Sequence, residues 1–326
     1  MKQSIDPSDS ANQITQLCLV YSPEPQTKTL LSPKDFRIRK PAPLVLKPML
    51  CDQQEDSQKA VGCEYNFKDL RLGKKIGSGA FGDVFVGFIQ GKFIAVKQMD
   101  GKQLIESVDN EIIILSKLTH KNIVQYYGYM REAGMLNVYL EYMDGGSLSD
   151  RLKQFGKFNE TLIRKFTIQI LDGLIYLHRQ AVVHRDLKCG NILSNQRGQI
   201  KIADFGSSSW KEAINLSDTE FCQSMKGSFK WMAPELLLKE KKYGRRVDVW
   251  SLGCVIIEMA TAEHPWPNIK SLAQLLEAIQ NLKCPPIPTH LSKECQNFIK
   301  RCCTYNKDQR PHAEILKEDP WIKKEI

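Results

Sequence analysis

Hydrophobic periodicity changes along this chain, and the change limits the folds that the chain can adopt. Between residues 69 and 99, apolar and polar residues alternate with a period of two, and glycines interrupt the alternation. This pattern predicts three antiparallel strands, with a turn at Gln90-Gly91 between the second and the third. From Leu148 onward, apolar residues recur at helical spacing, as in the stripe Ile163, Phe166, Ile170, Leu174 and Leu177. We therefore expect an α+β fold, with a β-rich part followed by a larger helical part.

Residues 1–66 have a different character. They have little periodic apolar pattern, their acidic and basic residues balance, and prolines recur at Pro23, Pro25, Pro33, Pro41, Pro43 and Pro48. A segment of this kind buries too little apolar surface to fold by itself, so a mostly disordered tail is expected. Folded structure is expected to begin near Phe67.

The composition argues against several classes of protein. Charged residues make up 25% and apolar residues 42% of the 326 residues, which are ordinary fractions for a globular protein. The net charge of +9 suggests nucleic-acid binding, but the basic residues are scattered without interleaved aromatics, so no nucleic-acid partner is expected. Ten cysteines without a CxxC pair fit neither a zinc site nor a disulfide framework. Because no apolar leader and no membrane-spanning run is found, we expect a cytoplasmic protein.

The glycines in the β-rich part have two interpretations. Gly77-x-Gly79-x-x-Gly82 matches the fingerprint of a dinucleotide-binding fold, and Asp100 stands near the spacing that this fold requires of an acidic residue. That fold needs a helix to begin at the glycines, whereas residues 84–86 form a β-rich run. We therefore favour a glycine-rich hairpin whose main-chain N–H groups approach phosphates, because no Cβ stands in the way.

Lys97 and Glu111 are candidates for binding and orienting a charged ligand. Lys97 ends the apolar strand that begins at Ile94, fifteen residues after Gly82, from where its ammonium group can reach phosphates. Glu111 opens the apolar run EIIILSKL, which is typical of a helix. It is either an exposed helix residue or the partner that orients Lys97, and the remaining motifs favour the partner.

The segment HRDLKCGN at residues 184–191 is the strongest candidate for a catalytic loop. The runs AVVH and ILS on either side predict short strands, so the polar residues fall on the loop between them. Asp186 can take a proton from an attacking hydroxyl, Lys188 can reach a transferring phosphate, and Asn191 can hold magnesium. Asp204 ends the predicted strand QIKIAD, and a carboxylate there suits magnesium as well. These residue types suggest phosphoryl transfer.

The segment LEYMDGGSL at residues 140–148 passes through a Gly-Gly break and predicts a connector between the two parts. An adenine ring could hydrogen-bond to its main chain near Glu141 and Met143, with Leu140 behind the ring. Further along, residues 207–228 are rich in serine and threonine and too long for a plain turn, which is typical of a functional loop.

Together these motifs resemble the eukaryotic protein kinase family. The chain carries GSGAFGDV, IAVK, a helix glutamate, HRDLKCGN, DFG, APE and DVWSLG in the order of that family. The resemblance covers residues 67–322 as a protein kinase domain and implies a two-lobed fold that binds ATP and Mg²⁺ in its cleft. It implies a small β-rich lobe with one main helix over about 67–140, a connector over 141–147 and a larger, mainly helical lobe over 148–322.

The resemblance also implies roles in catalysis and ATP binding. Asp186 would be the catalytic base and Lys188 would assist it, while Lys97 would hold the α- and β-phosphates and pair with Glu111. The residues that would contact ATP are Ile76, Gly77, Ser78, Gly79, Ala80, Phe81, Gly82, Val84, Ala95, Lys97, Leu140, Glu141, Met143, Ser147, Leu193 and Asp204.

Further roles concern the metal and the larger lobe. Asn191 and Asp204 would carry magnesium. Glu235 would pair with Arg310 to brace the larger lobe, and Asp248 would anchor the catalytic loop.

Within the family, the chain is similar to the serine/threonine branch, because Lys188 stands in HRDLK. HKNIVQYYGY, SMKGSFKWMAPE and YGRRVDVWSLGCVIIEMATAEHPWP are similar to MAP kinase kinase kinases. The implied substrate is a Ser or Thr in the activation loop of a MAP kinase kinase. The alternative function is a kinase-shaped scaffold of weak activity that docks cascade components. A scaffold would be expected to lack one of Lys97, Glu111, Asp186, Asn191 and Asp204, which are all present.

The chain departs from the family pattern after the long loop. The threonine and the proline–aromatic pair of GTPYWMAPE are replaced at residues 228–230 by Ser-Phe-Lys. Ser228 can still bond Asp186 and Lys188, whereas Lys230 changes the surface that is expected to contact the peptide substrate.

Three residues have candidate regulatory or packing roles. Ser224 lies in SMKGS, which matches the phosphorylated stretch of the family, and Arg185 can bond a loop phosphate, so Ser224 is the favoured activating phosphosite. Cys189 replaces a small residue of the catalytic loop. Packing is its main interpretation, and a redox-sensitive thiol is the alternative.

The tail contains a candidate docking peptide. A basic cluster at residues 37–40 precedes a proline-containing spacer and Leu44-x-Leu46. Peptides that MAP kinases recognise have a similar pattern, because cations meet an acidic patch and the two leucines project to the same side of an extended chain. The alternative is that this short pattern arose by chance in a tail of this composition.

Overall fold

The computed structural model describes residues 67–79, 82–100, 112, 114–132, 134–205, 209–210, 228–238 and 243–324. These residues form two compact units. The sheet unit runs from Phe67 to Leu118 and includes Gln125–Tyr142, and the helical unit comprises Thr119–Val124 and the residues from Met143 onward. The predicted tail of residues 1–66 lies outside the described residues, as do Ala80, Phe81, Glu111 and Ser224.

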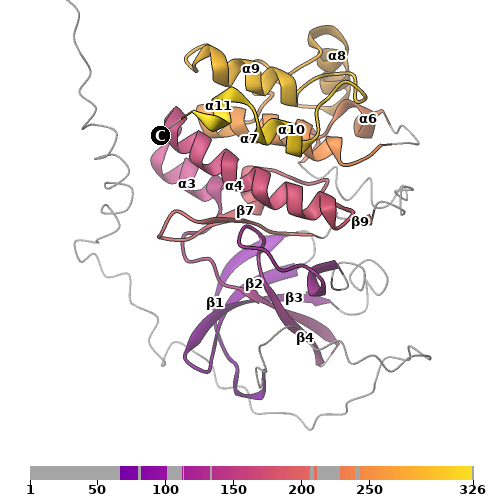
Figure 1. Ribbon diagram of the computed structural model, residues 1–326. Coiled ribbons are helices and arrows are strands. Elements are labelled where there is room, and N and C mark those ends of the chain that lie inside the picture. Colours follow the sequence, from indigo (N-terminus) through magenta and orange to yellow (C-terminus); the bar gives the residue numbers. More distant parts are fainter. Residues whose placement is uncertain are drawn as a thin grey trace, which may run out of the picture. The chain divides into compact units, whose positions relative to one another are not determined.

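The sheet unit is built on a five-stranded antiparallel sheet with the strand order β1-β2-β3-β5-β4 (Figure 1). Its strands are β1 (Arg71–Gly79), β2 (Gly82–Ile89), β3 (Lys92–Asp100), β4 (Tyr126–Glu132) and β5 (Met135–Glu141). The three strands that the alternation predicts are therefore confirmed. Gln90 and Gly91 connect β2 to β3 with φ of 47° and 79°. Two positive φ values give the kind of short turn whose twist matches that of the strands.

One face of this sheet is closed by an aromatic contact. The buried apolar cluster on this face consists of Ile89, Ile94, Val96 and Tyr139. Phe67, in the 3₁₀ helix η2 (Phe67–Asp69), stacks on the Tyr139 ring with the two centroids 3.9 Å apart. Gly128, with φ of 152°, makes room for it, since a Cβ there would lie 3.1 Å from the Phe67 ring. Phe67, near which the sequence predicts that folded structure begins, is thus packed into the sheet unit.

The helical unit surrounds the buried helix α7. Its helices are α3 (Leu148–Phe155), α4 (Glu160–Arg179), α6 (Pro234–Leu237), α7 (Arg246–Thr261), α8 (Leu272–Leu282), α9 (Lys293–Cys302), α10 (Ala313–Lys317) and α11 (Pro320–Lys323). α7 is buried from Val247 to Ala260 and packs against α4 and α9, as expected of a helix that is apolar on all sides (Figure 1). The predicted stripe of α4 is buried at each position from Ile163 to Leu177. The α+β fold class, with a β-sheet part and a mainly helical part, is confirmed.

Short strands flank the predicted catalytic loop. β6 (Val182–Val183) precedes the loop and β7 (Ile192–Ser194) follows it, as the runs AVVH and ILS predict. β7 pairs with β8 (Ile200–Ile202), and β6 pairs with β9 (Ser209–Trp210), both in antiparallel fashion. Two 3₁₀ helices complete this region, η3 (Cys189–Asn191) and η4 (Phe229–Trp231).

The sequence from His120 to Tyr129 predicts one strand of the β-rich part, but residues Thr119–Val124 lie in the helical unit. The main-chain N–H of Ile202 donates to Asn122 O over 2.9 Å, and the N–H of Val124 donates to Ile202 O over 3.0 Å. These bonds tie the segment to β8, so β4 begins only at Tyr126.

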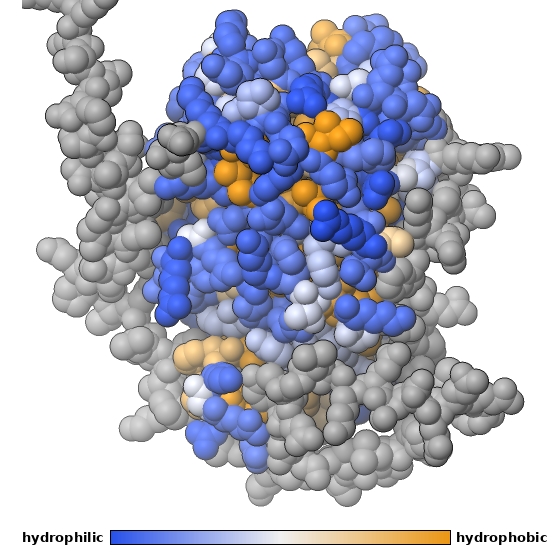
Figure 2. All heavy atoms as spheres, viewed as in Figure 1, coloured by the Kyte–Doolittle hydropathy of each residue, from blue (hydrophilic) through white to orange (hydrophobic). Residues whose placement is uncertain are grey.

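The surface of the described residues is mainly polar. On the face in Figure 2, hydrophilic residues prevail and hydrophobic residues form small separate patches. Exposed apolar side chains such as Leu282 and Ile315 are usual on protein surfaces. Within the described ranges, each helix is too short or too polar to cross a membrane.

Candidate active site

Asp186 lies between β6 and η3 and receives two hydrogen bonds on one carboxylate oxygen. Its Oδ2 accepts from Lys188 Nζ and from Asn191 Nδ2, each over 2.8 Å. Its Oδ1 accepts no hydrogen bond from the described residues, and the side chain is 15% exposed. Asp186 therefore keeps one acceptor oxygen for a ligand.

The turn of η3 brings Asn191 back to Asp186. The main-chain N–H of Asn191 donates to Lys188 O over 2.9 Å, and Nδ2 donates to the main-chain oxygen of Asp186 over 2.8 Å. Both hydrogens of Nδ2 are thus engaged with Asp186. Within the described part of the chain, Oδ1 of Asn191 accepts no hydrogen bond, which leaves this oxygen for a cation.

Lys188 connects the catalytic loop to the segment that follows the long loop. Its Nζ donates to Asp186 Oδ2 over 2.8 Å and to Ser228 Oγ over 2.6 Å. The predicted bond between Ser228 and Lys188 is present. Ser228 makes no direct bond to Asp186 in the described residues, because the ammonium group lies between them.

Asp248, in the first turn of α7, anchors the main chain of the catalytic loop. Its Oδ2 accepts from the His184 N–H over 3.0 Å, and its Oδ1 accepts from the Arg185 N–H over 2.8 Å. His178 Nε2 lies 2.8 Å from the same carboxylate. Burial alone would raise the pKa of Asp248, but the hydrogen bond and charge of His178, with smaller contributions from His184 and Arg185, hold it below its usual value. The anchoring role predicted for Asp248 is confirmed.

Cys189 packs inside the helical unit. Its main-chain N–H donates to Glu258 Oε2 over 3.1 Å, and Trp231 Nε1 donates to the same oxygen over 2.8 Å. Burial, and then the charge of Glu258, raise the pKa of the Cys189 thiol, whose side chain is fully buried. A thiol with these properties is a poor nucleophile, so the packing interpretation is favoured over the redox one.

Asp204 follows β8 in a left-handed conformation with φ of 63°. Its side chain is exposed, whereas the next residue, Phe205, is buried and meets the His184 ring at a centroid distance of 5.1 Å. His184 Nε2 lies 3.1 Å from Ala203 O. The buried neighbours thus fix the main chain on both sides of an exposed carboxylate.

The donor set of this loop fits a magnesium ion. Among the described residues, no group of three or more His, Cys, Asp or Glu side chains could hold a metal. Magnesium does not require such a group, because it keeps several water ligands and binds proteins through one or two oxygen donors. Asn191 Oδ1 and the Asp204 carboxylate are oxygen donors of this kind.

Four residues predicted to contact ATP share one face of the sheet. Val84 lies opposite Lys97 in the β2–β3 register, and Ala95 lies opposite Leu140 in the β3–β5 register. Since side chains alternate along a strand, Ala95 and Lys97 project from the same face, together with their cross-strand partners. Lys97 is 9% exposed, and a buried ammonium group requires compensating charge.

The hairpin that closes β1 and β2 requires glycine. Gly82 has φ of 139°, and a Cβ there would lie 2.0 Å from Gln98 O. It faces Gly79 at the end of the β1–β2 ladder. β2 begins at Gly82, where a dinucleotide-binding fold would begin a helix, so the hairpin interpretation is confirmed. The other predicted ATP contacts on β1 are Ile76, Gly77 and Ser78.

Polar groups of the connector residues form hydrogen bonds within the protein. The Glu141 N–H donates to Gln125 O over 2.8 Å, and the Gln125 N–H donates back to Glu141 Oε2 over 3.1 Å. Ser147 forms an isolated bridge with Leu193, but its hydroxyl caps α3 by accepting from Asp150 N over 3.1 Å. Met143 is buried in the helical unit.

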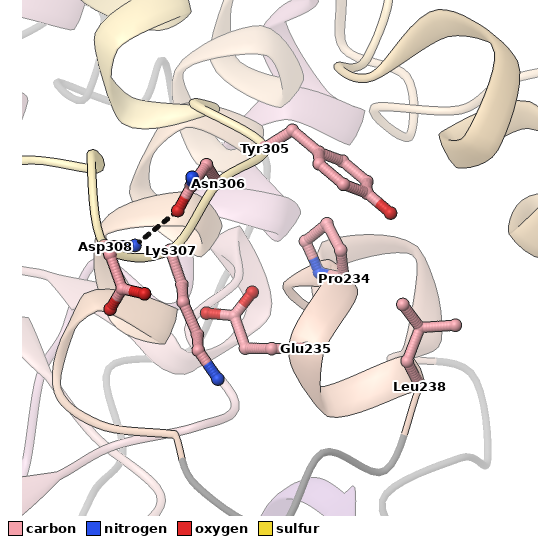
Figure 3. A pocket seen from close by; sticks show the side chains of 7 residues that line it. All are labelled: Pro234, Glu235, Leu238, Tyr305, Asn306, Lys307 and Asp308. Atoms are coloured by element: carbon pink, nitrogen blue, oxygen red, sulfur yellow. Dashed lines mark hydrogen bonds between the residues drawn. The ribbon is translucent and has the colours of Figure 1, made fainter.

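A buried ion pair braces the helical unit. Arg310 Nη1 and Nη2 donate to the two oxygens of Glu235 over 2.7 and 3.0 Å, as predicted. A pocket of about 260 Å³ opens beside this pair and is lined by Pro234, Glu235, Leu238, Tyr305, Asn306, Lys307 and Asp308 (Figure 3). No residue predicted to contact ATP or metal lines it.

Sequence reasoning missed two residues behind the catalytic loop. His178 bonds Asp248, and Glu258 receives the Cys189 N–H. Glu258 had a signal in the sequence, since it is a carboxylate within the apolar run of α7 and must find hydrogen-bond donors there. His178 had no comparable signal.

The family described as "Protein kinase domain" matches residues 70–322. With the sheet unit, the helical unit and the bonded group around Asp186 in place, this match shows that the chain belongs to the protein kinase domain family. Membership implies that the domain uses ATP and a divalent metal ion, generally Mg²⁺.

Several relatives have names from one branch of the family. The chain is 41% identical over 266 residues to "Mitogen-activated protein kinase kinase kinase 3" of Arabidopsis thaliana, covering 79% of this chain and 43% of that protein. It is 40% identical over 262 residues to "Mitogen-activated protein kinase kinase kinase A" of Dictyostelium discoideum, covering 77% and 27%. It is 38% identical over 297 residues to "MAP kinase kinase kinase mkh1" of Schizosaccharomyces pombe, covering 85% and 26%. The chain thus spans less than half the length of these relatives.

Proposed function

We propose that this protein is an ATP-dependent serine/threonine protein kinase that acts as a MAP kinase kinase kinase. It transfers the γ-phosphate of ATP to Ser or Thr hydroxyls of a protein, and a MAP kinase kinase is the expected substrate. The main evidence is the hydrogen-bonded group of Asp186, Lys188 and Asn191. Among the described residues, this group leaves Oδ1 of the Asp186 carboxylate without a hydrogen bond. The names of the relatives support the position in the cascade.

Asp186 acts on the attacking hydroxyl. The hydroxyl oxygen forms a bond to the γ-phosphorus, the bond from that phosphorus to the β,γ-bridging oxygen breaks, and ADP leaves. Oδ1 of Asp186 accepts the hydroxyl proton while Oδ2 stays bonded to its two donors. Lys188, fixed between Asp186 and Ser228, neutralises charge on the transferring group.

Other residues bind the metal ion and the phosphates. Asn191 and Asp204 hold magnesium, which supplies charge neutralisation for the phosphates when bound. Lys97 binds phosphate oxygens from the sheet unit, and Glu111 is its proposed partner. The glycine hairpin offers main-chain N–H groups to the phosphates.

The test is phosphate transfer to a panel of kinase-dead MAP kinase kinases. Wild type is expected to phosphorylate at least one of them on Ser or Thr, whereas Asp186→Asn and Lys97→Met lose about 10²–10⁴-fold in rate with unchanged far-UV circular dichroism. Equal rates for wild type and Asp186→Asn contradict the proposal. The scaffold alternative predicts binding of cascade proteins with equally weak transfer in both, and it is not favoured because the expected catalytic residues are all present.

We propose further that the protein is cytoplasmic and that residues 32–49 of the tail bind a MAP kinase. Two features of the sequence support the binding of a MAP kinase, namely the basic cluster at residues 37–40 and the alternating leucines Leu44 and Leu46. A peptide of residues 32–49 is expected to bind at low salt, to weaken as salt screens its cations, and to lose binding when both leucines become alanine. No binding of the unmodified peptide at low salt overturns this assignment.

A further inference from the structure

Three side chains connect β1 to β2 at the glycine hairpin. Asp83 Oδ1 accepts a hydrogen bond from Ser78 Oγ over 2.7 Å and lies 2.7 Å from Lys75 Nζ. Asp83 directly follows Gly82, the first residue of β2. The two contacts therefore join the strands where the chain enters and leaves the hairpin.

The position of Lys75 depends on an irregularity in the β1–β2 ladder. Gly77 lies opposite Val84, and the same register continued along β1 would place Lys75 opposite Val86. Lys75 would then lie on the sheet face of Val84, because side chains alternate along a strand. The register shifts by one residue between Lys75 and Gly77, so that Lys75 lies opposite Phe85 instead. A shift of one residue moves a side chain to the other face, so the irregularity transfers Lys75 there.

Asp83 and Ser78 share this other face. Asp83 and Phe85 alternate with Val84 along β2, and Ser78 lies opposite Asp83 in the register. Val84 belongs to the face that carries the predicted ATP contacts, so the Ser78 hydroxyl points away from that face. The main chain of Ser78, rather than its hydroxyl, is thus available to phosphates.

The charge of Asp83 is neutralised locally. The hydrogen bond from Lys75 first, and then the one from Ser78, hold the pKa of the Asp83 carboxyl below its usual value, so the group is ionised at neutral pH. A carboxylate next to a hairpin that approaches phosphates would repel them. The ammonium group of Lys75 offsets this negative charge.

We propose that Lys75 and Asp83 are positioning residues for ATP, because their ion pair holds the glycine hairpin in the conformation in which its main-chain N–H groups bind the phosphates. The inference rests on the proposed kinase function, which supplies ATP as the ligand. Since the pair lies on the face opposite the predicted ATP contacts, it acts through the main chain of the hairpin. The two side chains are 47% and 42% exposed, and an exposed pair changes an equilibrium by at most about fivefold.

The experiment measures the dissociation constants of Mg²⁺–ATP and of adenosine by titration calorimetry. Both ligands contain the base and the ribose, so only ATP reports on the phosphate contacts. Lys75→Met is expected to weaken ATP binding about three- to fivefold and to leave adenosine binding unchanged. Steady-state kinetics should show the same rise in KM for ATP with kcat unchanged. Lys75→Arg keeps a cation within reach of Asp83 and should retain the wild-type values.

A charge exchange separates the ion pair from the total charge. Lys75→Asp opposes two carboxylates and should weaken ATP binding at least as much as Lys75→Met. Adding Asp83→Lys to Lys75→Asp re-forms a pair of opposite charges and should restore most of the affinity. The matched control is Lys74→Met, which removes an equal charge from the neighbouring exposed residue of β1 and should keep the wild-type affinity.

Several outcomes overturn the inference. Equal losses of ATP affinity in Lys74→Met and Lys75→Met would assign the effect to total charge. Equal losses for ATP and adenosine would assign it to the fold of the sheet, and wild-type ATP affinity in Lys75→Met would show that the pair does not position the hairpin. In each of these cases phosphate transfer by wild type, and with it the kinase function, stands. Absence of ATP binding by wild type would overturn the kinase function and this inference together.

Discussion

Asp248 holds the main chain of Arg185 in a left-handed conformation. The Arg185 N–H donates to Asp248 Oδ1 over 2.8 Å, and Arg185 has φ of 69°. Such a conformation costs a residue with a side chain about 1–3 kcal/mol and persists only where its surroundings enforce it. The strain lies next to Asp186, so the buried carboxylate of α7 sets the position of the candidate catalytic base.

Asp248→Asn is expected to impair catalysis and stability together. The amide has one acceptor oxygen, so its NH₂ group would oppose the N–H of His184 or Arg185. We expect the free energy of unfolding to fall by about 1–3 kcal/mol and kcat to fall roughly 100-fold as Asp186 shifts. Urea unfolding and steady-state kinetics measure the two effects. The control Asp308→Asn alters a side chain that is 81% exposed, and a loss of similar size there would argue against the anchoring role.

Ser228→Ala tests the bond to Lys188. Without the hydroxyl, Lys188 Nζ keeps Asp186 as its only side-chain acceptor among the described residues. We expect kcat to fall about tenfold, since a hydrogen bond to a charged group contributes roughly 1.5–3 kcal/mol, part of which water replaces. Ser228→Thr keeps the hydroxyl and should retain most activity. An alanine variant as active as the threonine variant would show that the bond does not position Lys188.

Arg310→Met is expected to destabilise the helical unit strongly. It leaves the Glu235 carboxylate buried without its cation, which typically costs about 3–5 kcal/mol. Arg245→Met removes a partly exposed cation 3.9 Å from Glu314 and should cost less than about 1 kcal/mol. Chemical unfolding of both variants measures the two losses in the free energy of unfolding. Similar losses in the two variants would mean that the Glu235–Arg310 pair contributes no more than a surface pair.

Local features of this structure could be predicted from the sequence because they depend on periodicity. The alternation before Met99 gives β1, β2 and β3, and the stripe from Ile163 to Leu177 gives the buried side of α4. The group around Asp186 was also predictable, since Lys188 and Asn191 follow it within five residues and one 3₁₀ turn brings them together.

Partners from distant parts of the chain were harder to predict. His178 and Asp248 are 70 positions apart, and their pairing depends on how α4 packs against α7. Ser147 shows a different limit, because its hydroxyl could serve a ligand or cap α3, and only the structure reveals the cap. Residues Thr119–Val124 carry a strand-like pattern, yet bonds to β8 decide where they belong.

Acidification is expected to destabilise the protein below pH 6.5, in part through His120. His120 stacks on Tyr176 with centroids 4.8 Å apart, and its Nδ1 accepts from the Asn122 N–H over 3.1 Å, which requires the neutral ring. Burial first, and then the charges of Lys121 and Lys201, lower its pKa from 6.5, while Asp172 opposes them.

The direction of the pH dependence follows from the numbers of protons that the folded and the unfolded states bind. Between the lowered pKa of folded His120 and 6.5, the unfolded chain binds more protons than the folded one, so stability rises with pH and is lost as pH falls through this range. His264 and His312 have lowered pKa values and add to the same trend. The raised pKa of buried Glu258 acts in the opposite direction, so single curves cannot isolate His120.

A comparison of wild type with His120→Asn isolates the contribution of His120 to the pH dependence of stability. Asparagine can offer Oδ1 to the Asn122 N–H but does not titrate, while the other groups are shared by both proteins. Urea unfolding free energies measured from pH 7.5 to 5.5 should fall less steeply in the variant, even if its stability is lower throughout because the stacking on Tyr176 is lost. An NMR titration of the His120 ring in wild type measures the pKa directly. Parallel stability curves, or a ring pKa at or above 6.5, contradict the prediction.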